Sequence, residues 1–195
     1  MLVNAVKDTE LETPILLALA YGLRRSEIIG IKWDAIDFKQ KTITIKHTVT
    51  GAGKNLICAD KTKNASSYRT LPLLEGVEKY LLELQEHNKE MRKLFGNAYN
   101  KNDYVCTWND GRLVLPDHLS SKFKTIIKEV ELPNIRFHDL RHTVASLLLA
   151  DGYSLKEISE LLGHCSIGIT ANIYGHLQYK AKIDMGKSME SKLFG

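Results

Sequence analysis

His138, Arg141 and His142 form the densest group of residues in this sequence that could do chemistry. His138 and Arg141 are three positions apart, so on a helix they would share one face. Arginine presents a planar fork that fits two phosphate oxygens, and a neighbouring histidine can donate a hydrogen bond or move a proton near neutral pH. These residues therefore indicate a binding site for a phosphate-like anion. The spacing of His138 and Arg141 alone, however, is more often that of an ordinary surface pair.

A second group lies where one predicted helix ends at Gly22 and the next begins. Arg24 and Arg25 stand beside backbone N–H groups that already favour an anion. Glu27, three residues after Arg24, has two interpretations. It could orient the Arg24 guanidinium, or it could be a first-turn acid favoured by the helix dipole, and the residues alone leave both open.

Two further features are weak when taken singly. Tyr174 stands in an apolar helical context, where a tyrosine is more often a core residue, and His164 after Gly163 has the position of a helix-end cap. Lys61 and Lys63 lie in a polar stretch typical of a basic hairpin tip. The order of all four groups along one chain carries more weight than any one of them.

Hydrophobic periodicity predicts elements that would position these residues in a mainly α fold with a small antiparallel β-sheet, an α+β class. Residues 86–101 are polar and are predicted to be a loop, and Ser154 with Glu157 forms a capping box that fixes one helix start. Asp117 is expected to cap its helix. We predict strands at 41–46, 54–58 and 68–71, an extended piece at 104–108, and helices at 12–21, 26–31, from after Pro72 to about 87, 117–130, 137–150, 154–162, 166–174 and 180–193.

Bulk properties exclude several classes of protein. A chain of 195 residues with 44% hydrophobic content can bury one substantial core, and its net charge of +4 is too mild to indicate a nucleic-acid partner by itself. Three widely spaced cysteines and no signal peptide argue against disulfides and a cysteine zinc site, and we expect a cytoplasmic location. No apolar run approaches the ~20 residues that span a bilayer, so no membrane partner is expected.

Together, the segments 22–27, 138–142, 161–164 and 170–176 resemble the signature boxes of the tyrosine recombinase family, which includes bacteriophage and conjugative-transposon integrases. The resemblance covers about residues 14–176, with the boxes in the family's order. It implies a catalytic domain at 1–179 and a helical tail at 180–195 that docks on a neighbouring protomer or on its own domain. Upstream DNA-binding domains are expected to be absent from this fragment.

The resemblance also implies a role for each residue. Tyr174 would be the nucleophile, and Lys61 would protonate the leaving oxygen, with Lys63 as the alternative. Glu27 would orient the Arg24 guanidinium. The implied catalytic residues are Arg24, Lys61, His138, Arg141, His164 and Tyr174, and the implied DNA contacts are Arg25, Lys63 and His142.

The function implied by the resemblance is site-specific recombination of DNA through a 3′-phosphotyrosine intermediate, without metal or other cofactor. The partners would be a double-stranded DNA site and further copies of the chain, as a tetramer. Two alternatives remain: a type IB topoisomerase, which uses similar residues and a tyrosine, and a DNA-binding or regulatory module of the same fold without catalysis. A metal site built from His138, His142, His164 and His176 has little support. No glutamate lies between His138 and His142, and no third ligand has convincing spacing.

Overall fold

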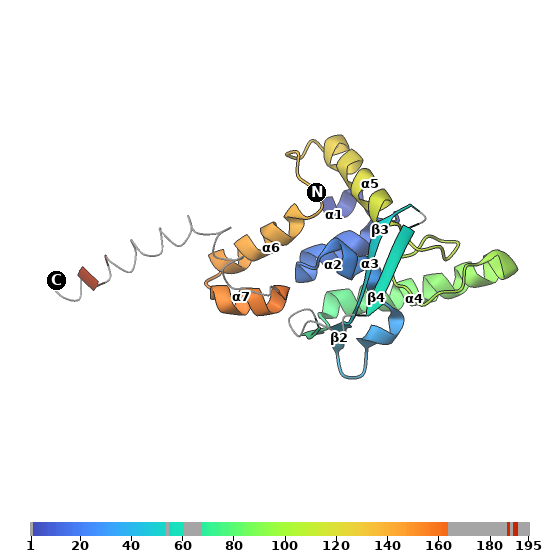
Figure 1. Cartoon of the computed structure of the whole chain (residues 1–195), viewed down its shortest axis with the longest axis horizontal. Helices are drawn as coiled ribbons and strands as arrows, with labels where there is room; N and C mark the ends of the chain where they lie inside the picture. The colour runs from blue at the N-terminus through green and yellow to red at the C-terminus, as the bar shows by residue number, and fades with distance from the viewer. Residues whose placement is uncertain (1, 54, 61–67, 164–186, 188, 191–195) are drawn as a thin grey trace.

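The computed structural model describes residues 2–53, 55–60, 68–163, 187 and 189–190 (Figure 1). The described part is mainly helical with antiparallel strands, as the sequence predicts, but the strands form two small sheets where one was expected. Its helices are α1 (Leu2–Ala5), α2 (Glu12–Tyr21), α3 (Arg25–Gly30), α4 (Glu75–Phe95), α5 (Pro116–Glu129), α6 (Asp139–Ala150) and α7 (Leu155–Leu162). There are two 3₁₀ turns, η1 (Trp33–Ala35) and η2 (Gly96–Ala98). The described strands are β1 (Ile36–Asp37), β2 (Thr42–Ile45), β3 (His47–Ala52), β4 (Asn55–Asp60) and β5 (Arg69–Pro72).

Helix α2 lies at the centre of the molecule, as Figure 1 shows, and it contacts α1, α3, α4 and α6. Its sequence is apolar on almost every side, which is typical of a helix buried all round. Ile15, Leu17 and Tyr21 are almost fully buried in the main core. The predicted bounds of this helix are confirmed, and the position of its end fixes where α3 can begin.

The strands form two separate sheets. β2 pairs with both β1 and β5, with Ile43 opposite Leu71, whereas β3 and β4 form a hairpin with His47 opposite Asp60. The sequence-based prediction did not include β3, which follows β2 after the single residue Lys46. α3 packs against β3 closely enough that a Cβ added at Gly30 would lie 2.6 Å from the His47 carbonyl oxygen. Glycine at position 30 thus allows the hairpin to lie against α3.

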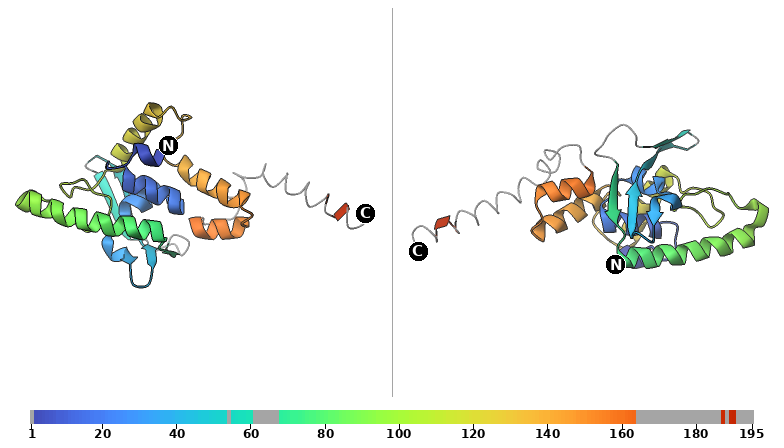
Figure 2. Two further views of the ribbon diagram at one scale, coloured as in Figure 1. Left: turned by 180° about the vertical axis from the view of Figure 1, so that it is seen from behind. Right: turned by 90° about the horizontal axis from the view of Figure 1, so that it is seen from below.

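The predicted loop at 86–101 is wrong over its first half, because α4 continues to Phe95. Residues 88–95 are rich in strong helix formers, and Glu86 and Lys89 form an ion pair at 2.6 Å on the helix surface. This half of α4 carries little buried apolar surface, and Leu94 is exposed. A helix that projects into solvent lacks the one-sided apolar pattern on which the prediction depended, and both views in Figure 2 show its far end beyond the body.

Asp117 is not the cap of its helix. The helix α5 begins with Pro116 in its first turn and has Leu115 at the N-cap, so Asp117 lies inside that turn. Its carboxylate instead accepts a hydrogen bond from the backbone N–H of Gly53 at 3.2 Å. Proline, with its fixed φ and missing N–H, therefore sets the start of this helix.

Helices α6 and α7 pack together beside α2 and share a small second core. The predicted capping box is confirmed: Ser154 Oγ accepts from the Glu157 N–H at 3.2 Å, and Glu157 accepts from the Ser154 N–H at 2.8 Å. α7 ends at Gly163, which has a φ of 67°. The helices predicted at 166–174 and 180–193 lie outside the described residues. Among the described helices, none has the length and apolar character to cross a bilayer.

Candidate active site

The end of α2 prepares the first part of the site. Gly22 closes the helix with a φ of 60°, and its N–H bonds to the Ala18 carbonyl at 2.9 Å. A Cβ at this position would lie 2.5 Å from the Leu162 side chain, so the end of α2 lies directly against the end of α7. Arg24 follows as the N-cap of α3 in extended conformation. Its side chain therefore starts at the junction between α2 and α3.

Three arginine side chains converge on the carboxyl-terminal end of α7. The last carbonyls of a helix have no partner inside the helix and carry the negative end of its dipole, so they favour cations. Each arginine donates to a different one of three successive carbonyls. The pairs are Arg69 Nε to Leu161 at 2.9 Å, Arg141 Nη2 to Leu162 at 2.8 Å and Arg24 Nη2 to Gly163 at 3.0 Å.

Glu27 is a fully buried carboxylate between two of these arginines. Its Oε1 accepts from Arg24 Nη1 at 2.9 Å, and its Oε2 accepts from Arg69 Nη2 at 3.0 Å. The same Oε2 also accepts from the Arg24 backbone N–H at 3.1 Å. Of the two interpretations left open by the sequence, the geometry favours the one in which Glu27 holds the Arg24 guanidinium.

Arg69 was missed by the sequence-based analysis. A signal was present, because Arg69 and the buried Leu71 are two residues apart on β5 and so point to the same face. An arginine on the core side of a strand needs a buried acid or carbonyl as its partner. That partner, Glu27, is far away in sequence, and pattern alone does not reveal it.

Arg141 is buried on α6, with 2% of the residue exposed. Besides Leu162, it donates through Nη1 to the Gly22 carbonyl at 2.7 Å. One guanidinium therefore joins the end of α2 to the end of α7. Charge-assisted hydrogen bonds of this kind fix the plane of the fork as well as its position.

His138 is the N-cap of α6 and lies at the surface, one turn before His142. The two rings meet edge to face, with centroids 5.0 Å apart. Partial loss of hydration lowers the pKa of His138, and electrostatic interactions with His142 and Arg141 lower it further. The imidazole therefore favours its neutral form at neutral pH, in which one ring nitrogen donates a hydrogen bond and the other accepts one.

A cleft of about 530 Å³ opens beside His138. Arg25 lies in its wall and is itself tied to α5, because its Nη1 donates to the Pro116 carbonyl at 3.2 Å and to the Ser120 hydroxyl. None of the described residues that line it is acidic, so the cleft suits an anionic ligand. They are Arg25, Ser120, Lys124, Asn134, Ile135, Arg136, Phe137 and His138.

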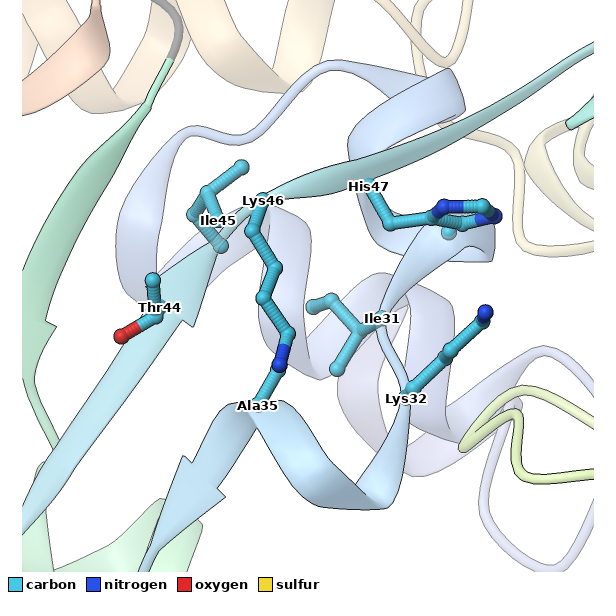
Figure 3. Close-up of a pocket in the computed structure, with 8 residues that line it drawn as sticks. Ile31, Lys32, Ala35, Thr44, Ile45, Lys46 and His47 are labelled. Atoms are coloured by element: carbon cyan, nitrogen blue, oxygen red, sulfur yellow. The ribbon is translucent and has the colours of Figure 1, made fainter. Parts of the chain in front are cut away.

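A second hollow, between α3 and β2, is lined by Lys32, Lys46 and His47, among others (Figure 3). It has no room for a water molecule and cannot hold a ligand. Its importance lies in His47, whose Nδ1 is 2.6 Å from Asp60 Oδ1 and whose Nε2 is 3.1 Å from the Tyr104 hydroxyl. This bond to His47 lowers the pKa of Asp60 and fixes the end of β4, one residue before Lys61.

The structure thus brings together Arg24, Glu27 and Arg141, and places His138 one turn before Arg141. Lys61, Lys63, His164 and Tyr174 lie outside the described residues, as does His176. Within the described ranges, no group of three histidine, cysteine, aspartate or glutamate side chains is arranged to hold a metal ion.

Residues 2–181 match the model of the phage integrase family. The chain belongs to this family. A tyrosine recombinase XerC-like protein of Caldanaerobacter subterraneus subsp. tengcongensis is 35% identical over 193 residues, which cover 92% of this chain and 49% of that protein. The ICEBs1 integrase of Bacillus subtilis is 29% identical over 178 residues, with 91% and 48% covered. The resemblance inferred from the four signature segments is therefore confirmed.

Two solved structures share the fold. The Tn1549 transposon integrase, in complex with transposon right end DNA, superposes with a TM-score of 0.78 at 20% identity, covering all of this chain and 63% of that one. The XerA recombinase gives a TM-score of 0.64 at 23% identity, with 96% and 60% covered. The chain spans about half the length of the curated relatives it matches.

Proposed function

We propose that this chain is the catalytic part of a site-specific DNA recombinase, which cuts and rejoins strands through a covalent link to Tyr174. The observation that carries the proposal is the convergence of Arg24 and Arg141, from α3 and α6, on neighbouring carbonyls at the end of α7. His164 follows that end by one residue in the sequence. Two preorganised guanidinium groups suit the charge that develops on a phosphate under attack.

The reaction is a pair of transesterifications. The Tyr174 oxygen forms a bond to phosphorus as the bond from phosphorus to the 5′ oxygen breaks, and the product is a 3′-phosphotyrosine. The phenol gives up its proton to a base, for which His138 and His164 are the candidates, and the leaving oxygen gains one from Lys61. The 5′ hydroxyl of another strand then reverses the step, so the reaction needs no metal and consumes no nucleotide.

Lys61 rather than Lys63 is the proposed acid. The pair formed by His47 and Asp60 anchors the residue immediately before Lys61. An anchored neighbour reduces the freedom of a long side chain that must reach a single oxygen. Lys63 is two residues further from this anchor and is assigned to DNA contact, with Arg25 and His142.

The proposed partner is double-stranded DNA, bound as a recombination site by a tetramer of the complete protein. Similar solved structures support a DNA partner: the Tn1549 integrase is in complex with transposon right end DNA, and the XerH site-specific recombinase is bound to difH substrate. The basic cleft beside His138 gives the chain a surface of suitable charge. We assign 1–179 to the catalytic domain, 180–195 to a docking tail, and the cytoplasm as the place of action.

A covalent adduct would test the proposal. The protein is incubated in chelator with a pool of nicked duplexes whose flanking sequences are randomised, and the products are separated under denaturing conditions. We expect a DNA–protein adduct from the wild type and from Tyr179→Phe, a matched control five residues away, and none from Tyr174→Phe.

Three results would contradict the proposal in different ways. A wild type that binds the duplexes without forming an adduct would support the alternative, a DNA-binding module without catalysis. An adduct that disappears in chelator would indicate a metal-dependent reaction. An adduct that persists in Tyr174→Phe would assign the nucleophile to another residue.

A further inference from the structure

We propose that Arg69 is a positioning residue, which sets the orientation of Arg24 and of the last turn of α7. Resting on the proposed function, the inference adds a residue outside the set assigned from the signature segments. Arg69 belongs to β5, the first described strand after the segment that contains Lys61 and Lys63. Its contacts link β5 to α3 and to the last turn of α7.

The contacts of Arg69 join three elements through one guanidinium. Nε donates to the Leu161 carbonyl at 2.9 Å, and Nη2 donates to Glu27 Oε2 at 3.0 Å. Nη1 lies 3.4 Å from Glu27 Oε1, the oxygen that also accepts from Arg24. The flat fork of arginine is suited to this two-oxygen geometry, and lysine cannot reproduce it with a single ammonium group.

Arg69 and Arg24 share Glu27 but differ in exposure. The Arg69 side chain is 9% exposed, whereas that of Arg24 is 33% exposed. Within the described part of the chain, Arg69 donates its hydrogen bonds to Glu27 and Leu161. Arg24 is thus the more accessible to a phosphate, and Arg69 acts on it through their shared carboxylate.

Loss of Arg69 would change two features of the site. The buried Glu27 carboxylate would keep Arg24 as its cation, and the guanidinium of Arg24 would be drawn toward the carboxylate and away from the Gly163 carbonyl. The Leu161 carbonyl would lose its donor, and the last turn of α7 would be less firmly held. Both changes occur where Arg24 and the chain entering His164 must be placed correctly.

The first test compares Arg69→Ala and Arg69→Lys with Arg112→Ala. Arg112 is an exposed arginine that pairs with Asp110, two residues away, and does not belong to the arginine cluster at the end of α7. Single-turnover adduct formation is measured as protein concentration is raised to saturation on the nicked pool. We expect Arg69→Ala to lower the saturating rate roughly a hundredfold, as for a misplaced catalytic group, while the half-saturating concentration stays within about twofold.

Arg69→Lys retains the charge without the fork, so it should recover only part of the rate, and Arg112→Ala should match the wild type. This split between rate and affinity distinguishes positioning from a general loss of folded protein. If Arg69→Ala does not fold, Arg69→Lys provides the same comparison. A variant at position 69 that cleaves at the wild-type rate would overturn the inference.

A second test does not depend on catalysis. Amide hydrogen exchange of the peptide covering α7 is measured in the full chain for the same variants. We expect faster exchange near residues 161–163 in both Arg69 variants and unchanged exchange in Arg112→Ala. Unchanged exchange in the Arg69 variants would refute the positioning role even if the wild type forms an adduct. A wild type without adduct would instead refute the proposed function and leave the exchange result interpretable.

Discussion

At the scale of single residues, the site depends on how its positive charges are held. Arg24, Arg69 and Arg141 each use part of their donor set on carbonyls at the end of α7, and Glu27 supplies the counter-charge. Fixed guanidinium groups need little rearrangement when a phosphate arrives, which is the property that lowers a barrier in charge-stabilised reactions. The cost is a buried carboxylate whose charge has to remain paired.

Glu27→Gln tests that pairing. The substitution keeps the shape of the side chain but leaves two arginines without their shared counter-charge, and we expect a loss of about 3 kcal/mol in the free energy of unfolding. Glu86→Gln is the matched control, because Glu86 pairs with Lys89 on an exposed helix surface, and it should change stability by less than about 0.5 kcal/mol. Chemical denaturation measures both, and equal effects would contradict the role of Glu27 as a paired buried charge.

His138 provides a prediction about pH. Its pKa lies below the ordinary histidine value of 6.5, mainly through lost hydration and then through His142 and Arg141. The unfolded chain therefore binds this proton more readily, so the contribution of His138 to stability falls as pH drops below 6.5 toward the folded-state pKa. In an NMR titration, His142→Gln should raise the pKa of His138 without restoring 6.5. A titration of His138 above 6.5 in the wild type would contradict this account.

At the scale of elements, the site depends on helices that end at fixed places. α2 ends at Gly22 and α7 at Gly163, and the two ends lie against each other. These boundaries, and the capping box at Ser154, could be predicted because glycine and capping residues act locally. The end of α4 could not, because an exposed helix without a buried stripe has the composition of a polar loop.

Gly22→Ala should destabilise the protein by about 2 kcal/mol or more. A left-handed residue with a Cβ is strained, and the Cβ would meet the Leu162 side chain at 2.5 Å. Gly76→Ala is the matched control, because Gly76 lies in α4 with open space around it. This variant should be more stable than the wild type by roughly 0.5 kcal/mol. Opposite signs in thermal unfolding would support the account, whereas stabilisation by both substitutions would contradict it.

At the scale of the whole molecule, the described part places its basic cleft beside His138, where α5 and the segment before α6 line it. The net charge of +4 did not predict this surface, because a total says nothing about distribution. Arg24, Glu27 and Arg141 could be selected from motif order, but the partnership of Glu27 with Arg69 is a contact between α3 and β5 that appears only when the chain folds.

Lys124→Gln tests the cleft as a DNA-binding surface. If Lys124 contacts one phosphate, the slope of log affinity against log salt for duplex DNA should become shallower by about 0.9. Lys93→Gln, in the last turn of α4, removes the same charge from a different element and should leave the slope unchanged. Equal changes in both variants would mean that affinity follows net charge rather than the cleft.

The measurement that bears most directly on the central claim is the identity of the residue joined to DNA. The adduct from the nicked pool is digested with nuclease and protease, and the modified peptide is sequenced by mass spectrometry. The account predicts a phosphate on Tyr174, joined to the 3′ end of the cleaved strand. A phosphate on any residue other than Tyr174, including Tyr153 and Tyr179, would contradict it.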